Sequence, residues 1–229
     1  MNPPQASVDR RPALLGKLKG LYAITPEEPS TQVLARKVRL ALAGGASIVQ
    51  YRSKSADPAA RRAQGEALLA LCRASCVPLI VNDDLELAQA IGADGLHLGR
   101  EDVPIAAARG RLGPAKILGA SCYDQLALAA AARDAGADYV AFGSAFASRT
   151  KPGAVRASLA LYREAKSRLG CPIVAIGGIT SRNAQALIDA GVDSVAVIRA
   201  LFDAEDIEQR AREFAAMFVT HGLEKRPAV

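Results

Sequence analysis

The sequence of 229 residues contains no tryptophan, and only 4% of its residues are aromatic. Proteins that bind single-stranded nucleic acid without sequence preference stack bases on aromatic side chains, so this deficit argues against that class. The net charge is +6, yet the lysines and arginines are dispersed and form no block of like charge. A dispersed positive excess is better suited to a phosphate-bearing metabolite than to a nucleic-acid duplex.

Long apolar runs and metal-binding cysteine patterns are also missing. No uninterrupted run of about 18 apolar residues occurs, so no membrane span is expected. The first residues, MNPPQASVDRRP, lack the apolar core of a secretory signal. The four cysteines match no common zinc spacing, and only two histidines are available to complete one. We therefore expect a cytoplasmic protein whose thiols are reduced and serve packing.

The dominant pattern is an alanine-rich helical stretch that ends at a glycine and is followed by a short apolar run. Four segments share it: AGGASIVQ (43–50), IGADGLHL (91–98), AGADYVAF (135–142) and AGVDSVAV (190–197). The first glycine of each segment suits the left-handed residue that ends a helix. The apolar run that follows is typical of a buried strand. One helix-to-strand connection is thus predicted to recur four times.

Four further apolar runs complete the predicted set of strands. They cover 20–25, 78–83, 116–121 and 172–178. Buried strands that alternate with helices predict an α/β protein, a single (β/α)₈ or TIM barrel over residues 20–219. Residues 1–19 are then an N-terminal extension and 220–229 a C-terminal tail. A doubly wound open sheet is the alternative, but its glycine-rich fingerprint is missing after the first strand.

Polar residues gather where the predicted strands end, which is the end of a barrel that carries active sites. Gln50, Arg52 and Lys54 alternate along the second strand and are predicted to point the same way. Two cations and an amide on one side suit an anion, although a solvated strand end is the alternative. Asp83 and Asp102 follow neighbouring strands, where two carboxylates suit Mg²⁺ but could also cap helices.

Three more features belong to the same predicted rim. His97 lies on the fourth strand; a lone buried histidine can be structural, but its position at the mouth favours substrate contact. The segment 143–153 has a glycine at each end and carries Lys151, which predicts a mobile lid or, alternatively, a solvated loop. Gly177 and Gly178 occupy the usual phosphate position of this fold, although close packing also explains such a pair.

Taken together, these motifs resemble the thiamine-phosphate synthase family. They are, in order, LYAIT, QYRSK, VNDD, DGLHLGRED, GASCYD, DYVAFGSAFASRTK, AIGGI and GVDSVAVIRALF. The resemblance implies a Mg²⁺-dependent transferase of thiamine biosynthesis. Such an enzyme couples 4-amino-5-hydroxymethyl-2-methylpyrimidine diphosphate with a thiazole phosphate and releases pyrophosphate. Small-molecule substrates are then the expected partners, without nucleic acid or membrane, and a homo-oligomer is allowed.

The resemblance also implies roles for the residues that match the family's motifs. Gln50 and His97 would contact the pyrimidine. The diphosphate would be held by Arg52, Lys54, Asn82, Ser121 and Lys151. Asp83 and Asp102 would bind Mg²⁺. The thiazole side would comprise Ser148, Thr150, Gly178, Ile198 and Arg199. In the implied dissociative reaction Arg52, Lys54 and Lys151 stabilise the leaving diphosphate.

The chain departs from the family's usual motifs mainly on the thiazole side. Ser144 and Ser148 replace a proline and a threonine, Arg199 stands where a serine is usual, and Arg100 where a glutamine is frequent. We expect the Arg199 side chain to fold over the thiazole phosphate; the other option is that it points away between the last helices. The alternative functions are a thiazole tautomerase and a non-catalytic barrel that binds thiamine phosphates, neither of which needs the two metal carboxylates.

Overall fold

The computed structural model describes residues 15–147 and 155–224 of the chain. Eight parallel strands close into one barrel in sequence order, and the last strand pairs with the first. The strands are β1 (Gly20–Ile24), β2 (Ala46–Tyr51), β3 (Leu79–Asn82), β4 (Gly95–Leu98), β5 (Ile117–Tyr123), β6 (Tyr139–Phe142), β7 (Ile173–Ile176) and β8 (Ser194–Val197). The predicted (β/α)₈ barrel is confirmed.

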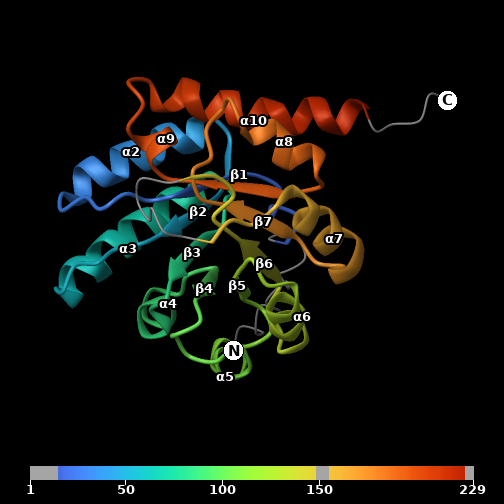
Figure 1. Cartoon of the computed structure of the whole chain (residues 1–229). Helices are drawn as coiled ribbons and strands as arrows, with labels where there is room; N and C mark the ends of the chain where they lie inside the picture. The colour runs from blue at the N-terminus through green and yellow to red at the C-terminus, as the bar shows by residue number, and fades with distance from the viewer. Residues whose placement is uncertain (1–14, 148–154, 225–229) are drawn as a thin grey trace, which may run out of the picture.

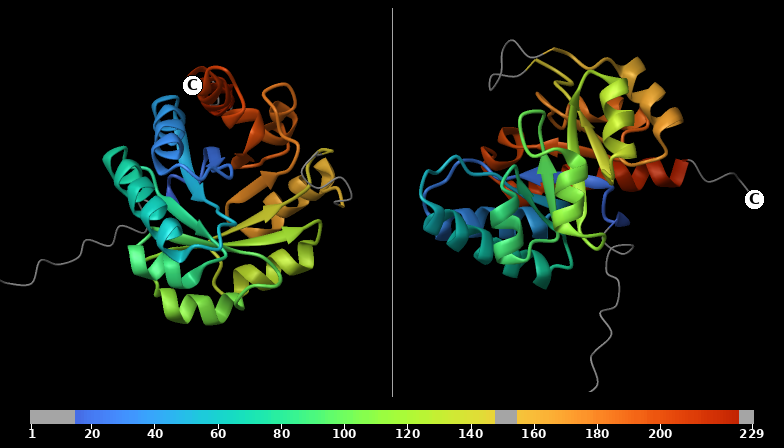
Figure 2. Two further views of the ribbon diagram at one scale, coloured as in Figure 1. Left: turned by 90° about the vertical axis from the view of Figure 1, so that its left-hand side faces the viewer. Right: turned by 90° about the horizontal axis from the view of Figure 1, so that it is seen from below.

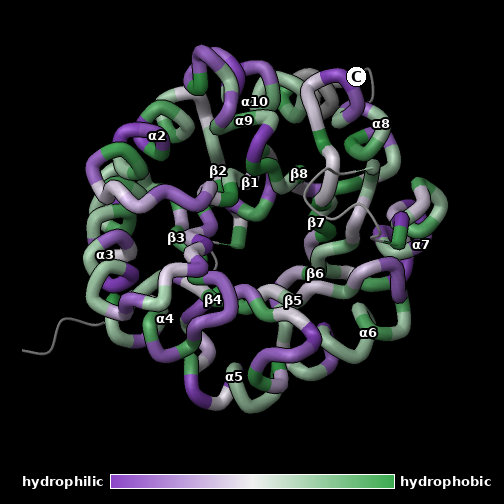
Figure 3. The backbone as a smooth tube through the Cα atoms, turned by 60° about the vertical axis from the view of Figure 1, so that its left-hand side comes forward, coloured by the Kyte–Doolittle hydropathy of each residue, from purple (hydrophilic) through white to green (hydrophobic). Residues whose placement is uncertain are grey.

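The helices form a ring around the strands (Figure 3). They are α2 (Thr31–Ala43), α3 (Pro58–Ala74), α4 (Leu85–Ile91), α5 (Ile105–Leu112), α6 (Leu126–Asp134), α7 (Leu159–Leu169), α8 (Ala184–Asp189), α9 (Arg199–Phe202) and α10 (Ile207–Glu224). The long helix α10 packs against α2 and α8 and so closes the ring (Figures 1 and 2). None of the helices in the described ranges combines the length and apolar character that a membrane span requires.

Two apolar cores hold the barrel together. The larger core lies between the strands and the surrounding helices, and the smaller one fills the barrel interior. The interior core contains Tyr22, Ile24, Ile48, Ile80, Ile117, Tyr139, Ala141, Val174 and Ala196. Leu18, which precedes β1, is 2% exposed and packs against this interior core, together with the partly buried Leu15. Part of the segment before β1 therefore covers the interior at the amino end of the strands.

The predicted helix-to-strand connection recurs, with a one-residue correction in its first copy. Gly92, Gly136 and Gly191 have positive φ angles of 68°, 105° and 94°, as expected of residues that end a helix in the left-handed region. In the first copy this conformation belongs to Gly45, with φ 97°, whereas Gly44 has φ −81°. A Cβ at Gly44 would overlap the backbone of α10, so close packing explains the first glycine of that segment.

A side chain two residues after each positive-φ glycine ties one strand to the preceding strand. Three aspartates accept a backbone N–H: Asp94 from Leu79 at 3.0 Å, Asp138 from Leu118 at 2.8 Å and Asp193 from Ile173 at 2.9 Å. In the first copy Ser47 takes this position, and its hydroxyl donates to the carbonyl oxygen of Leu21 at 3.1 Å. The repeat in the sequence thus corresponds to a repeated side chain–backbone hydrogen bond between neighbouring strands at the amino end of the barrel.

Candidate active site at the carboxyl ends of the strands

The second strand sends Gln50 into the barrel. Gln50 is 3% exposed, and its Nε2 donates to the hydroxyl of Tyr22 at 2.9 Å. The neighbouring Tyr51 points outwards, where its hydroxyl donates to Gln64 of α3. Because β2 ends at Tyr51, the strand alternation that was predicted to align three side chains governs only Gln50. Arg52 and Lys54 lie beyond the strand and are placed by other contacts.

Those contacts come from the segment that follows β1. Glu27 forms an ion pair with Arg52, with Oε1 3.1 Å from Nη1, and its Oε2 accepts the backbone N–H of Lys54 at 2.9 Å. The buried Thr25 hydroxyl oxygen accepts the backbone N–H of Arg52 at 2.9 Å. Glu27 is not among the residues predicted from the sequence, yet it engages the arginine predicted to bind an anion.

The two predicted metal carboxylates lie together at the mouth. Asn82 Nδ2 donates to Asp83 Oδ2 at 2.5 Å, and the backbone N–H of Gly99 donates to Asp102 Oδ2 at 2.6 Å. Burial, and then a hydrogen bond with Asp102 and its charge, raise the pKa of Asp83 to about 6, while Arg52 and Asn82 act in the opposite direction. Two acidic groups are therefore held at a distance where they repel one another.

Helix capping, the alternative function for these carboxylates, falls to a third aspartate. The side chain of Asp84 accepts the backbone N–H of Leu87 at 2.9 Å at the start of α4, and it pairs with Arg61 at 3.0 Å. Asp83 itself has a φ of 62°, a left-handed conformation that is uncommon outside glycine. The described residues contain no group of three or more acidic, histidine or cysteine side chains suited to a metal ion.

His97 lies inside the mouth and is hydrogen-bonded through both ring nitrogens. Nδ1 lies 2.9 Å from the hydroxyl of Tyr139, and Nε2 lies 2.9 Å from the hydroxyl of Ser121. Its ring stacks on that of Tyr139, with a centroid distance of 5.5 Å. Burial lowers the pKa of His97 to about 4, although the charge of Asp102 acts in the opposite direction. The imidazole is therefore neutral at neutral pH.

Two tyrosines of the barrel interior join this group and were missed by the sequence analysis. The hydroxyls of Tyr22 and Tyr139 lie 2.7 Å apart, and both side chains are almost completely buried. Burial raises the pKa of both hydroxyls. Gly119 faces Tyr139 across β5 and β6, and a Cβ at Gly119 would overlap the tyrosine ring and hydroxyl. A strand glycine opposite a strand tyrosine is the signal that could have revealed the pair.

On the far side of the mouth, Gly177 and Gly178 have φ angles of 101° and 64°. A Cβ at Gly177 would overlap Ser144, and one at Gly178 would overlap the backbone of the segment after β6. Phe146 donates its backbone N–H to the carbonyl oxygen of Gly177 at 3.0 Å. Close packing, the alternative that the sequence left open, therefore accounts for both glycines, and phosphate binding there stays a prediction.

The end of β8 carries Ile198 and Arg199, which lie at the start of the short helix α9. The Nε of Arg199 donates to Asp203 Oδ2 at 3.1 Å, and both side chains are exposed. The guanidinium is thus directed along α9, and the expectation that it folds over a thiazole phosphate stays a prediction. The guanidinium of Arg100 lies over the ring of Tyr123, 4.8 Å from its centroid.

The structure brings together Gln50, Arg52, Asn82, Asp83, His97, Asp102 and Ser121 at the β2–β5 side of the mouth. Lys54 is exposed beside this group, and Gly178, Ile198 and Arg199 follow the strands β7 and β8. Three predicted residues, Ser148, Thr150 and Lys151, lie outside the described residues, as does the tip of the predicted lid.

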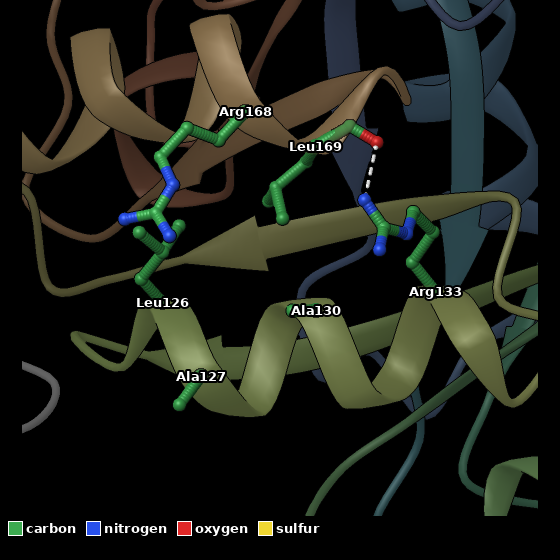
Figure 4. Close-up of a pocket in the computed structure, with 6 residues that line it drawn as sticks. All are labelled: Leu126, Ala127, Ala130, Arg133, Arg168 and Leu169. Atoms are coloured by element: carbon green, nitrogen blue, oxygen red, sulfur yellow. Dashed lines mark hydrogen bonds between the residues drawn. The ribbon is translucent and has the colours of Figure 1, made fainter.

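Cavities lie both beside the mouth and elsewhere in the part of the chain that the structure describes. One of about 300 Å³ lies beside the mouth and is lined by Tyr51, Ser53, Arg61, Val81, Asn82, Asp83, Asp84 and Leu87. Another, of about 400 Å³, lies between α6 and α7 and is drawn in Figure 4. There Arg133 donates to the carbonyl oxygen of Leu169 at 3.1 Å. None of the residues that line this second cavity belongs to the mouth, so the cavity is separate from the candidate active site.

The fold and the mouth define a class of protein: a barrel enzyme whose active site, at the carboxyl ends of the strands, suits a phosphorylated small molecule. Within that class, the chain belongs to the family described as thiamine monophosphate synthase, whose model TMP-TENI matches residues 21–201. The matched range covers every strand except the first residue of β1. The resemblance inferred from the motifs is confirmed.

Individual relatives agree with the family. The chain is 58% identical over 199 residues to the thiamine-phosphate synthase of Thiobacillus denitrificans, covering 87% of this chain and 94% of that protein. It is 56% identical over 204 residues to the thiamine-phosphate synthase of Methylobacillus flagellatus, covering 89% and 97%. Thiamine-phosphate synthases are transferases, so the predicted enzyme class is confirmed as well.

Solved structures confirm the fold. A thiamine phosphate pyrophosphorylase from Pyrococcus furiosus superposes with a TM-score of 0.80 at 37% identity and covers 91% of this chain and 98% of that one. A 3-hexulose-6-phosphate synthase superposes with a TM-score of 0.64 at 19% identity and covers 86% and 99%, a likeness of fold alone.

Proposed function

We propose that this chain couples 4-amino-5-hydroxymethyl-2-methylpyrimidine diphosphate with a thiazole phosphate in a Mg²⁺-dependent, dissociative reaction that yields thiamine phosphate and pyrophosphate. One observation carries the proposal beyond family membership. Asp83 and Asp102 interact with each other at the mouth, and the positive charge of Arg52 is close enough to act on Asp83. Two carboxylates that can bind Mg²⁺ and an arginine that can bind a phosphate anion thus occur in one region, as a metal-bound diphosphate requires.

The donor set fits Mg²⁺. Mg²⁺ prefers oxygen ligands and is commonly held by one or two carboxylates, with the remaining positions taken by water and substrate phosphates. Asp83 and Asp102 supply two such carboxylates. Burial is the main cause of the raised pKa of Asp83, and the neighbouring Asp102 adds a repulsion that a bound cation would relieve. When bound, the ion supplies positive charge that neutralises the departing diphosphate.

The chain's own residues hold the diphosphate on the β2–β5 side of the mouth. Arg52 donates to phosphate oxygens through its planar guanidinium, in place of its present pairing with Glu27. Lys54, Asn82 and Ser121 add donors around the same group. Lys151 is assigned to the diphosphate as well, on the basis of its family motif.

Bond breaking and bond forming need no protein nucleophile. The bond between the methylene carbon of the pyrimidine and the diphosphate oxygen breaks, and its electron pair leaves with the diphosphate. Positive charge that develops on the methylene is delocalised into the aminopyrimidine ring, which Gln50 and His97 hold. The thiazole nitrogen then donates its lone pair to the methylene carbon. The protein's contribution is to position both substrates and to stabilise the leaving group.

We assign the thiazole phosphate to the opposite side of the mouth. Gly178, Ile198 and Arg199 follow the neighbouring strands β7 and β8 there, and backbone N–H groups suit a phosphate. Ser148 and Thr150 are assigned to the thiazole ring from their motif. The exposed pairing of Arg199 with Asp203 is of the same weak kind as that of Arg52 with Glu27, so we assign the Arg199 guanidinium, together with the backbone, to the phosphate in exchange for that pairing.

We also place the protein in the reducing cytoplasm. The four cysteines are free thiols, and burial raises the pKa of Cys72 and Cys122 to about 12. Such thiols are inert packing groups rather than reactive nucleophiles.

The test is pyrophosphate release by the purified chain. We expect release only when the pyrimidine diphosphate, the thiazole phosphate and Mg²⁺ are all present, with equal formation of thiamine phosphate. A chain that isomerises the thiazole without the pyrimidine is a tautomerase. A chain that binds thiamine phosphate without turnover is a binding protein. Either result contradicts the proposal.

A further inference from the structure

A continuous chain of hydrogen bonds runs through the barrel interior from one predicted substrate-contacting residue to another. It begins at Gln50 Nε2, passes to the Tyr22 hydroxyl at 2.9 Å, and continues to the Tyr139 hydroxyl at 2.7 Å. From there it reaches His97 Nδ1 at 2.9 Å, and His97 Nε2 lies 2.9 Å from the Ser121 hydroxyl. We call this chain the tyrosine relay; it joins five strands, β2, β1, β6, β4 and β5.

The chemistry of the first group decides the direction of every later bond. An amide nitrogen only donates, so the Tyr22 oxygen accepts from Gln50. Among the described residues Tyr139 is the remaining hydrogen-bond partner of this buried hydroxyl, so its single proton is assigned to Tyr139. The Tyr139 oxygen then accepts, and its proton goes to His97 Nδ1. A neutral imidazole with an accepting Nδ1 carries its proton on Nε2, which donates to the Ser121 oxygen.

We propose that Tyr22 and Tyr139 are positioning residues. Through this relay they fix the tautomer of His97, and they decide whether Gln50 and Ser121 offer a donor or an acceptor to a ligand. At one end the Gln50 amide is held with its nitrogen on Tyr22, so its Oε1 is offered to a ligand as an acceptor. At the other end the Ser121 oxygen is used as an acceptor, so its hydroxyl proton is offered as a donor. Neither tyrosine has to touch a ligand for this.

Burial makes the relay hard to disrupt. Tyr22 is 1% exposed, Tyr139 is completely buried and His97 is 7% exposed, so a broken link would leave a polar atom without water to replace its partner. Gly119 gives the Tyr139 hydroxyl the space it occupies, since any Cβ there would overlap it. Reversal of the relay would require the Gln50 amide to turn over and every hydroxyl to reorient together.

The consequence for the substrate rests on the proposed function. A ligand ring that presents an N–H group to Gln50 matches the accepting Oε1, and a phosphate oxygen matches the donating Ser121. An aminopyrimidine diphosphate has both features. An analogue with an oxo group in place of the exocyclic amino group would place its oxo oxygen, a hydrogen-bond acceptor, against Oε1 of Gln50, which is also an acceptor. The relay therefore selects amino over oxo pyrimidines.

The first readout is the His97 tautomer, measured by ¹⁵N NMR on histidine-labelled chain at neutral pH, with the second histidine signal removed by His221→Gln. We expect an unprotonated Nδ1 and a protonated Nε2. Tyr139→Phe removes the proton that holds Nδ1 and is expected to give a mixture of tautomers. Tyr22→Phe removes the donor to Tyr139 and is expected to weaken the tautomer preference in the same direction. A protonated Nδ1 in the parent chain overturns the proposal.

The second readout is kinetic. Tyr139→Phe and Tyr22→Phe are each expected to lower kcat/KM for the pyrimidine diphosphate about tenfold, the effect of one lost hydrogen bond. KM for the thiazole phosphate should stay within about twofold, and discrimination against the oxo analogue should fall by a similar factor.

The matched control is Tyr162→Phe. Tyr162 is equally buried, but its hydroxyl donates to the Phe142 carbonyl oxygen at 3.0 Å in the outer core, away from the relay. This variant should leave both the His97 tautomer and the substrate discrimination unchanged. Equal kinetic losses in all three variants, or unchanged tautomer and kinetics in both relay variants, overturn the proposal. A correct tautomer in a chain without synthase activity would overturn the proposed function and leave the relay standing.

Discussion

Asp83 and Asp102 are the residues on which the proposed chemistry depends most. We expect Asp83→Asn and Asp102→Asn each to lower turnover at least about a hundredfold, because each removes one carboxylate that would hold Mg²⁺. The fold should persist, since the loss of one carboxylate relieves the repulsion between Asp83 and Asp102, which adds to burial in raising the pKa of Asp83. The measurement is pyrophosphate release across a Mg²⁺ titration, with thermal unfolding in parallel.

The neighbouring Asp84 is the matched control. It caps α4 and pairs with Arg61; asparagine also caps helices, so Asp84→Asn should lower stability only by the lost ion pair, about 0.2–1 kcal/mol, and leave turnover nearly intact. Near-normal turnover of either mouth variant at limiting Mg²⁺ would contradict the metal assignment.

Glu27 competes with an anion for Arg52. Its carboxylate pairs with the guanidinium at 3.1 Å, in a contact where both side chains are partly solvated. We expect Glu27→Gln to tighten pyrophosphate binding about two- to fivefold, since exposed ion pairs contribute roughly 0.2–1 kcal/mol. Isothermal titration with Mg²⁺ and pyrophosphate measures this, and the gain should shrink at high salt. Weaker binding by the variant would mean that Glu27 holds Arg52 in place for the anion instead.

At this scale the sequence reveals residues with distinctive chemistry and misses those whose role depends on a distant partner. Asp83, Asp102 and His97 stand out because they follow or interrupt apolar strands. Tyr22 and Tyr139 look like ordinary core residues within apolar runs. Their hydroxyls meet across 117 residues of sequence, and no local pattern records that contact.

At the scale of secondary-structure elements, the junction of α2 and α10 depends on a glycine. A Cβ at Gly44 would overlap the Glu208 carbonyl oxygen and the Ala211 side chain. We expect Gly44→Ala to lower the free energy of unfolding by about 1–3 kcal/mol, the usual effect of overpacking. Turnover at low temperature should be retained, because the junction is far from the mouth. Urea denaturation measures the change.

Gly110→Ala is the matched control: the same substitution is expected to change stability in the opposite direction. Gly110 lies within α5, and nothing stands within 4 Å of a Cβ built there. Alanine in an open helical position should stabilise by about 0.5–1 kcal/mol. If both variants shifted stability in the same direction, the packing explanation for Gly44 would be wrong.

The strands and helices were predictable from the sequence because glycine-ended helices and apolar runs are local signals. The register of the first repeat was not. Two adjacent glycines, Gly44 and Gly45, offer the same local pattern in two registers, and only the packing of α10 distinguishes them. The link from Ser47 to Leu21 then takes the place that aspartates fill in the other three copies.

At the scale of the whole molecule, closure of the barrel is what assembles the mouth. Pairing of β1 with β8 completes the ring, and inward side chains from five strands then meet in the tyrosine relay. The sequence predicted the barrel from its count of strands and the rim from its polar residues. It could not predict which inward side chains bond to one another, because that depends on the relative stagger of strands far apart in the chain.

Burial of a neutral histidine links this interior to global stability. The pKa of His97 is about 4 in the folded protein, compared with about 6.5 for an unfolded chain. As pH falls below 6.5, the unfolded chain binds a proton at this histidine while the folded protein does not. Stability is therefore lost as pH falls from about 6.5 to the folded pKa of about 4. Between pH 7 and pH 4 the loss is on the order of 2–3 kcal/mol.

The raised pKa of Asp83 acts in the opposite direction over the same range, so the pH dependence of the parent chain alone does not isolate the contribution of His97. We therefore expect His97→Asn to show a smaller loss of stability on acidification than the parent, measured by urea denaturation with a chelator present. Parallel pH profiles for the two proteins would show that His97 takes up its proton as readily in the barrel as in water.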